Sequence, residues 1–81
     1  MRYIIYILKS NKDSKRYYIG ITRNLEKRLD EHSNNQNEYT KKFAPWRIET
    51  FITFKNKLLA ERFERYLKSG SGHAFLHKHL I

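Results

Sequence analysis

The sequence contains no cysteine, a single proline and only three glycines. Without cysteine there is no disulfide bond, no thiolate nucleophile and no cysteine-based zinc or iron–sulfur site, so stability must come from packed aliphatic and aromatic side chains. Long apolar stretches are also missing. The longest run, residues 3–8, is far shorter than the ~20 residues of a membrane-spanning helix, and Lys9 ends it too early for a signal peptide. We therefore expect a cytoplasmic protein without a membrane segment.

Acidic residues are scarce too. Eight Asp and Glu stand against 17 Lys and Arg in 81 residues, which gives a formal net charge of +9. A charge of this size on a small chain predicts a polyanionic partner, and nucleic acid is the first candidate. Hydrophobic residues make up 40% of the chain, which is enough for a small packed core. We expect a single domain over residues 1–81, as a monomer or a weak dimer.

The hydrophobic pattern predicts three strands. Residues 3–8 and 17–22 are β-branched, aromatic and aliphatic, and the short connection between them predicts an antiparallel hairpin. The first strand has no polar alternation, which indicates burial on both faces. Gly20 lies near the end of the second strand, where a missing side chain usually marks a bulge or a close approach by another group. A third strand is predicted at residues 47–54, after Pro45.

Helical spacing follows the hairpin and again the third strand. Thr22 or Asn24 is the expected cap of a first helix that carries Leu25 and Leu29, and residues 33–42 are expected to form a polar loop. A second helix is predicted at residues 58–68, a glycine-serine break at 69–72, and a short last helix from residue 73. The order β-β-α-β-α-α predicts an α+β fold, an α/β sandwich in which helices pack on a three-stranded sheet.

Several short motifs stand at fixed distances along the chain. Tyr6 lies in "YIIYIL" and Tyr18 begins the triplet of "YYIGIT", while "NLEKRLDEH" places Arg28 ten positions after Tyr18 and His32 four positions further on. Downstream come "APWRI" and "AERFERYLKSGSGH". In this combination, and over essentially its whole length, the chain resembles the GIY-YIG nuclease family. Ile4 stands where the glycine of the first triplet would be, and a late asparagine of some family members has no match here.

The resemblance implies a metal-dependent endonuclease that hydrolyses phosphodiester bonds in DNA, with RNA not excluded. It would have little sequence specificity and a structure-selective role in DNA repair or recombination. Glu64 is the expected ligand of Mg²⁺ or Mn²⁺, because magnesium is usually held by one or two carboxylates plus water and phosphate. Arg28 would clamp the phosphate with its planar guanidinium. Tyr6 and Tyr18 would position or deprotonate the attacking water, and which of the two is the base stays open.

The remaining expected contacts are with the DNA. His32 would relay a proton or steady the phosphate. Further residues would hold the nucleic-acid backbone without reading its sequence: Lys9, Lys15, Arg16, Gly20, Arg23, Lys27, Thr40, Lys41 and Lys42.

Most of these roles have a structural alternative. Tyr6 and Tyr18 are of a type that commonly packs within sheets. The structural alternative for Arg28 is a surface residue whose aliphatic stem covers apolar side chains. His32 would end its helix, where an imidazole interacts well with the terminal carbonyl groups.

The acid and the overall function also have alternatives. Glu64 could form an ordinary helix ion pair with Lys68 four residues on, and Glu61 is the rival carboxylate. At the level of the whole chain, the alternative is a nucleic-acid-binding module of the same fold that has lost catalysis. A third reading is a protein-interaction adaptor whose charge meets an acidic partner.

Overall fold

The computed structural model describes residues 2–33 and 41–81, without the side chains of residues 31–33. Three strands form one sheet in the order β2-β1-β3: β1 (Tyr3–Ser10), β2 (Tyr17–Thr22) and β3 (Trp46–Phe54). β1 pairs antiparallel with both neighbours. The helices are α1 (Leu25–Ser33), α3 (Lys57–Leu67) and α4 (Gly70–His79). The predicted α+β class, the antiparallel hairpin and the order β-β-α-β-α-α are confirmed.

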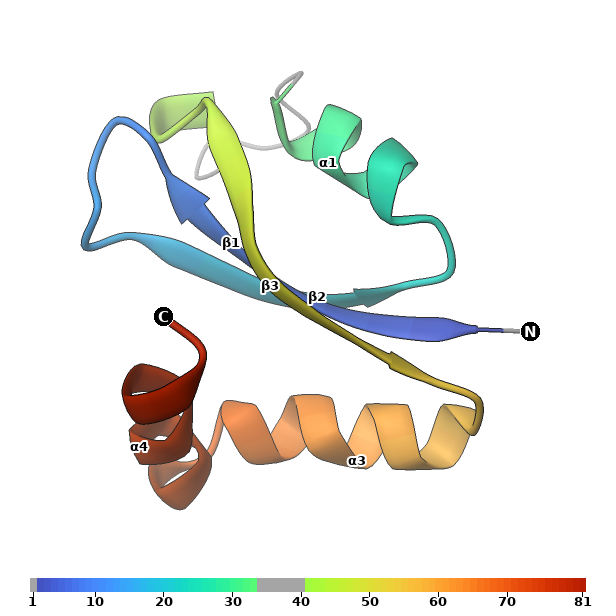
Figure 1. Cartoon of the computed structure of the whole chain (residues 1–81). Helices are drawn as coiled ribbons and strands as arrows, with labels where there is room; N and C mark the ends of the chain where they lie inside the picture. The colour runs from blue at the N-terminus through green and yellow to red at the C-terminus, as the bar shows by residue number, and fades with distance from the viewer. Residues whose placement is uncertain (1, 34–40) are drawn as a thin grey trace.

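The sheet lies between two helical layers. α1 covers one face, and α3 and α4 lie on the other (Figure 1). β1 is the middle strand, so its side chains are buried on both faces, as predicted. Ile5 and Ile7 point to α3 and α4, whereas Tyr6 and Leu8 point to α1, because successive side chains of a strand alternate.

Each face has a small core of its own. Toward α3 and α4, the isoleucines of β1 pack with Ala60, Leu67 and Leu76, which are fully buried. Toward α1, Leu8 packs with Trp46, and Leu25 and Leu29 of the helix complete this second core. Burying an aliphatic side chain of this size contributes about 1.5–3 kcal/mol. Because side chains of β1 belong to both cores, this strand makes the largest contribution to holding the layers together.

Side-chain caps define where the first two described helices begin. The Asn24 carboxamide oxygen accepts a hydrogen bond from the Lys27 amide at 3.0 Å, so Asn24 is the cap of α1. The Thr22 hydroxyl supports it by accepting from the Asn24 amide at 3.1 Å. In α3 the same role belongs to Asn56, which accepts from the Leu59 amide.

The C-terminal part differs from the prediction. We expected a break at residues 69–72 and a helix from residue 73, but α4 begins at Gly70. Ser69 is its cap and accepts from the Gly72 amide at 3.3 Å. The glycines and serine that suggested a break are thus the cap and first turn of a helix that follows α3 almost directly.

Two further boundaries move. β1 continues to Ser10, whose buried hydroxyl donates to the Phe43 carbonyl and accepts from the Lys12 and Asp13 amides at 3.0 Å each. The loop predicted at residues 33–42 is shorter at both ends, since Ser33 belongs to α1 and residues 41–42 have helical backbone. Its centre lies outside the described residues. In the described ranges, no helix is long and apolar enough to cross a membrane.

Candidate active site

The two tyrosines of the motifs lie together on the face of the sheet that α1 covers. The hairpin register pairs Tyr6 with Gly20 and Leu8 with Tyr18. The rings of Tyr6 and Tyr18 are stacked, with centroids 6.4 Å apart and planes 15° from parallel. Tyr6 is only 2% exposed, whereas Tyr18 is half-buried. Tyr18 is therefore the more accessible phenol.

Gly20 makes room for the ring of Tyr6. A β-carbon built on Gly20 would overlap the hydroxyl and the adjoining ring carbons of Tyr6. The expectation of a close approach at this glycine is met, and the approaching group is the Tyr6 side chain. Because Gly20 is buried, its contact with nucleic acid stays a prediction.

Replacing Gly20 with alanine is expected to destabilise the protein by about 1–3 kcal/mol, because an extra methyl group in a packed site forces its neighbours to shift. Thermal unfolding of Gly20→Ala measures the effect. The control is the same change in a Tyr6→Leu background, where the end of the ring is absent and the loss should largely disappear. Equal losses in the two backgrounds would show that Tyr6 is not the group being displaced.

Arg28 reaches the same face from α1. Leu25, Arg28 and Leu29 are half-buried at a spacing of three and four residues, so this side of the helix faces the sheet. The Nε atom of Arg28 is buried. The structure thus brings Tyr6, Tyr18 and Arg28 to one face of the sheet. His32 lies one turn further along α1, but its side chain is outside the described residues.

Glu64 belongs to the other layer. Its carboxylate lies 3.6 Å from the Lys68 ammonium and its side chain is 20% exposed, so the expected helix ion pair is present. Lys57 and Glu61, on the same side of α3, lie beside the end of β2. Glu64 follows Lys57 and Glu61 at helical spacing, so it lies on the same side of α3, along the edge strand β2. The acid and the tyrosines therefore border β2 from opposite faces, and their meeting in one hollow stays a prediction.

The predicted nucleic-acid contacts form two groups among the described residues. At the hairpin end, Arg16 and Lys42 lie over the Phe43 ring, at 4.9 and 5.5 Å from its centre. Beyond β2, Arg23 lies 5.8 Å from the centre of the Tyr3 ring. The group at the hairpin end also contains Lys9, Lys15 and Lys41, and the group near Arg23 contains Lys27. Thr40 lies outside the described residues.

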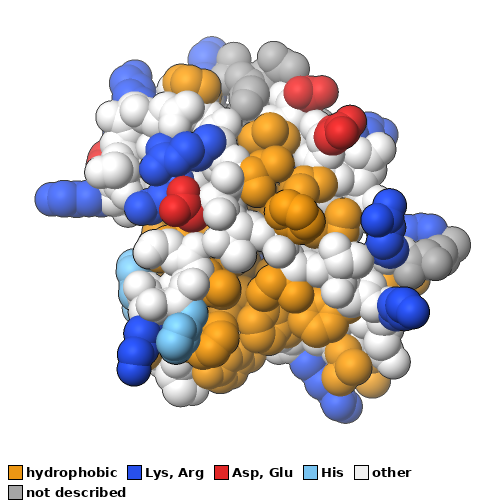
Figure 2. Space-filling view, in the orientation of Figure 1, with side chains coloured by type: hydrophobic (Ala, Val, Ile, Leu, Met, Phe, Trp, Pro, Cys, Tyr) orange, Lys and Arg blue, Asp and Glu red, His pale blue; other side chains and the backbone are white. Residues whose placement is uncertain are grey.

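Figure 2 shows Lys and Arg side chains at both sides of one face, with apolar side chains in the middle. The contact of these basic residues with nucleic acid stays a prediction.

Glu64 is the predicted ligand of a divalent metal ion. Among the described side chains, no three His, Asp or Glu come together in a way that could hold a metal ion. The partly exposed Glu64 carboxylate is nevertheless a suitable single ligand for Mg²⁺, which commonly takes its remaining oxygens from water and substrate phosphate. The donor set thus fits a hard divalent cation and not a zinc ion held by protein ligands alone.

Comparison with known families decides what kind of protein this is. The model of the GIY-YIG catalytic domain matches residues 2–75. The chain belongs to the GIY-YIG family. The general kind of enzyme implied by a GIY-YIG domain is a nuclease, a hydrolase of nucleic acids. The predicted family resemblance is confirmed.

Two relatives of this GIY-YIG chain carry the name UPF0213. One, from Clostridium perfringens (strain 13 / Type A), is 41% identical over 65 residues, which cover 79% of this chain and 68% of the relative. The other, from Bacillus halodurans, has a solution NMR structure that matches with a TM-score of 0.58 at 28% identity, over 96% of this chain and 84% of the other. The GIY-YIG fold is therefore present over nearly the whole chain.

Proposed function

We propose that this chain is a divalent-metal-dependent endonuclease that hydrolyses DNA with little sequence specificity and selects its substrate by structure. The observation that carries the proposal is the stacking of Tyr6 on Tyr18 on the face of the sheet that Arg28 approaches from α1. The family and the net charge of +9 support a nucleic-acid substrate.

The burial of the two phenols suggests different roles for them. Tyr18 is the more accessible phenol, so it would orient the attacking water and, once ionised to the phenolate, accept its proton and return to the phenol. Tyr6 is nearly inaccessible and would act as a positioning residue that fixes the ring of Tyr18. Arg28 would bind two oxygens of the scissile phosphate with its guanidinium fork. Glu64 would hold the divalent cation. When bound, that cation neutralises charge on the phosphoryl oxygens.

A second candidate is a DNA-binding module of the same fold without catalysis. It is favoured by the ion pair between Glu64 and Lys68 and by the position of α3 on the other face of the sheet from the tyrosines. It predicts salt-sensitive binding to DNA and no cleavage with any divalent metal.

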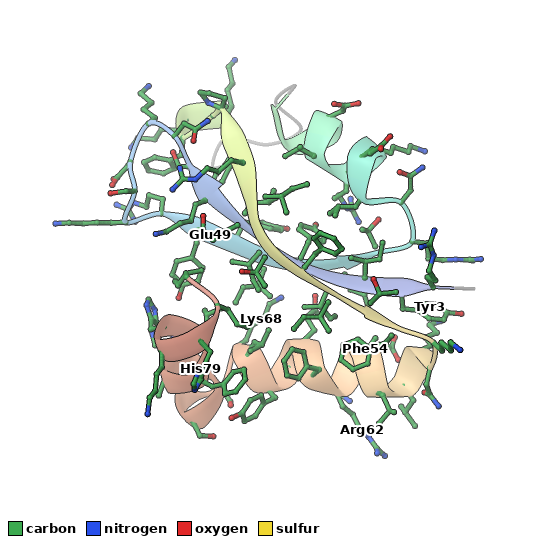
Figure 3. All side chains as sticks on the ribbon, viewed as in Figure 1. Tyr3, Glu49, Phe54, Arg62, Lys68 and His79 are labelled. Atoms are coloured by element: carbon green, nitrogen blue, oxygen red, sulfur yellow. The ribbon has the colours of Figure 1, made fainter. Side chains whose placement is uncertain are left out.

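The test is nicking of a flapped or branched DNA duplex by the purified protein, with Mg²⁺ or Mn²⁺ and with a chelator. We expect cleavage only with metal. Arg28→Lys should lower the nicking rate about 10²-fold, because lysine keeps the charge but loses the planar fork that binds two oxygens. Arg62→Lys is the matched control, since Arg62 projects from α3 away from the sheet (Figure 3).

Three outcomes of this experiment are informative. Cleavage that Arg28→Lys lowers and Arg62→Lys does not supports the proposal. An unchanged rate in Arg28→Lys would contradict the role of Arg28 as the phosphate clamp. Salt-dependent binding without any product, under both metals, would identify the catalytically inactive module instead.

A further inference from the structure

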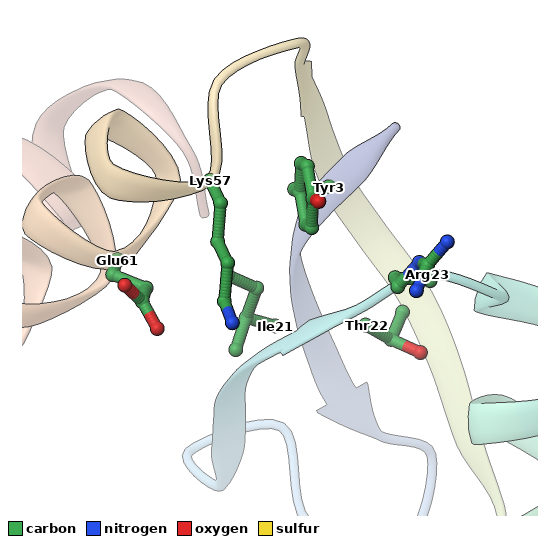
Figure 4. Close-up of a pocket in the computed structure, with 6 residues that line it drawn as sticks. All are labelled: Tyr3, Ile21, Thr22, Arg23, Lys57 and Glu61. Carbon is green, nitrogen blue, oxygen red and sulfur yellow. The ribbon is translucent and has the colours of Figure 1, made fainter. Parts of the chain in front are cut away.

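A pocket of about 220 Å³ lies where β1 begins, β2 ends and α3 begins. Its lining residues are Tyr3, Ile21, Thr22, Arg23, Lys57 and Glu61 (Figure 4). Of these, only Arg23 was among the predicted contacts with nucleic acid. The pocket exists because α3 turns back under the sheet after β3, which brings the start of this helix beside the end of the edge strand.

The pocket combines three kinds of chemistry. The Tyr3 ring and the Ile21 side chain provide apolar surface, and both are half-buried. Arg23 and Lys57 are exposed cations, seen on either side of Tyr3 in Figure 4. Glu61 supplies a partly buried carboxylate, which only accepts hydrogen bonds when ionised. Aromatic surface, positive charge and an acceptor are the groups that a nucleotide requires for its base, its phosphate and its amino group.

The size of the pocket limits the ligand. Sites for drug-sized molecules and cofactors usually measure about 300–1,000 Å³, and this pocket is smaller. A single base fits such a volume better than a dinucleotide cofactor does. Stacked base pairs of a duplex could not present a base here, because the base must leave its stack to contact the Tyr3 ring.

We propose that this pocket binds one unpaired nucleotide of a DNA strand. Its base lies against Tyr3, its phosphates are held by Arg23 and Lys57, and its exocyclic amino group donates to Glu61. The inference rests on the proposed function only in taking DNA as the ligand. Glu61 is three residues before Glu64 on α3, so the pocket adjoins the proposed metal ligand and would direct cleavage to strands with an unpaired nucleotide.

The carboxylate predicts a base preference. Adenine, cytosine and guanine carry an exocyclic amino group that can donate to Glu61, whereas thymine presents a carbonyl oxygen at the corresponding position. A carboxylate beside that oxygen leaves two acceptors facing each other. Unpaired cytosine and adenine should therefore bind more tightly than unpaired thymine.

The experiment measures binding and needs no catalysis. Fluorescence anisotropy with the full chain, in a chelator and at constant salt, compares short single-stranded homopolymers of dA, dC and dT with a blunt duplex. We expect dA and dC to bind about 10-fold more tightly than dT, and Glu61→Gln to reduce this difference to about 2-fold, because an amide can also donate. Tyr3→Leu should weaken binding of all single strands about 5- to 100-fold.

Matched controls separate the pocket from general effects. Tyr66→Leu removes an exposed tyrosine elsewhere on the surface and Lys78→Ala an exposed cation on α4; both should leave the base preference unchanged. If Tyr3→Leu unfolds, Lys57→Ala and Glu61→Gln still test the pocket, because they alter side chains at its rim.

Equal affinity for dT, dC and dA in the wild type, or a preference for the duplex, would overturn the proposal. So would a wild-type base preference that Glu61→Gln leaves unchanged. These failures are distinct from failure of the proposed function. If the protein nicks DNA with metal but shows no base preference, the proposed nuclease function is supported and the proposed nucleotide pocket is contradicted. If it shows the base preference but no cleavage, the pocket is supported and the nuclease function is contradicted.

Discussion

Replacing Glu64 with glutamine is expected to lower the rate of metal-dependent DNA nicking about 10²- to 10³-fold, with little effect on stability. Glutamine has the same shape but no charge, so it binds a divalent cation poorly. The stability should hold because glutamine keeps the shape of the half-buried side chain, and helix ion pairs at a spacing of four residues contribute only about 0.3–0.5 kcal/mol. Single-turnover nicking rates and thermal unfolding of the same preparations measure both quantities.

Glu49→Gln is the matched control. Glu49 on β3 is also part of an ion pair, with Arg47 at 3.4 Å, so the substitution removes the same charge and a similar contact. It should leave the nicking rate within about 2-fold of the wild type, because β3 is the opposite edge strand of the sheet from β2, which Glu64 borders. Equal nicking by Glu64→Gln and wild type would eliminate Glu64 as the metal ligand, and a large loss in Glu49→Gln would mean that net charge alone explains the effect.

The fold was predictable because each strand carries its own pattern. The β-branched and aromatic run of β2 ends where helix-capping residues begin, so its bounds were predicted correctly. The two-sided burial of β1 followed from its unbroken apolar sequence. The start of α4 was predicted wrongly because Ser69 and the glycines after it are typical of breaks, and only the packing of Gly72 against α3 reveals that they begin a helix.

The candidate site was predictable only in part. Tyr6 and Tyr18 share a face because the hairpin register fixes their alternation, and Arg28 joins them because α1 follows directly. The deep burial of Tyr6 depends on the ring crossing Gly20, which no spacing along the chain reveals. Likewise, the pocket that contains Glu61 depends on the direction in which α3 leaves β3. Sequence identified the residue types, and tertiary packing decided which of them are accessible.

The two glycines of α4 illustrate the difference between local propensity and packing. On propensity alone, glycine to alanine inside a helix stabilises by about 0.5–1 kcal/mol. A β-carbon on Gly70, at the start of α4, has no neighbour within 4 Å among the atoms described. The same atom on Gly72 would overlap the Tyr66 carbonyl group at the end of α3. The same substitution two residues apart should therefore have opposite effects.

Gly72→Ala is expected to destabilise the protein by about 3 kcal/mol or more, because the group in the way is backbone and cannot move without separating α4 from α3. For a domain of this size that corresponds to a fall in melting temperature of roughly 12–24 °C. Gly70→Ala should leave the melting temperature unchanged or raise it slightly. Calorimetry or circular dichroism on both variants measures the effect. If the two variants melt together, the close approach of Gly72 to the end of α3 does not contribute to the stability of the packing between α4 and α3.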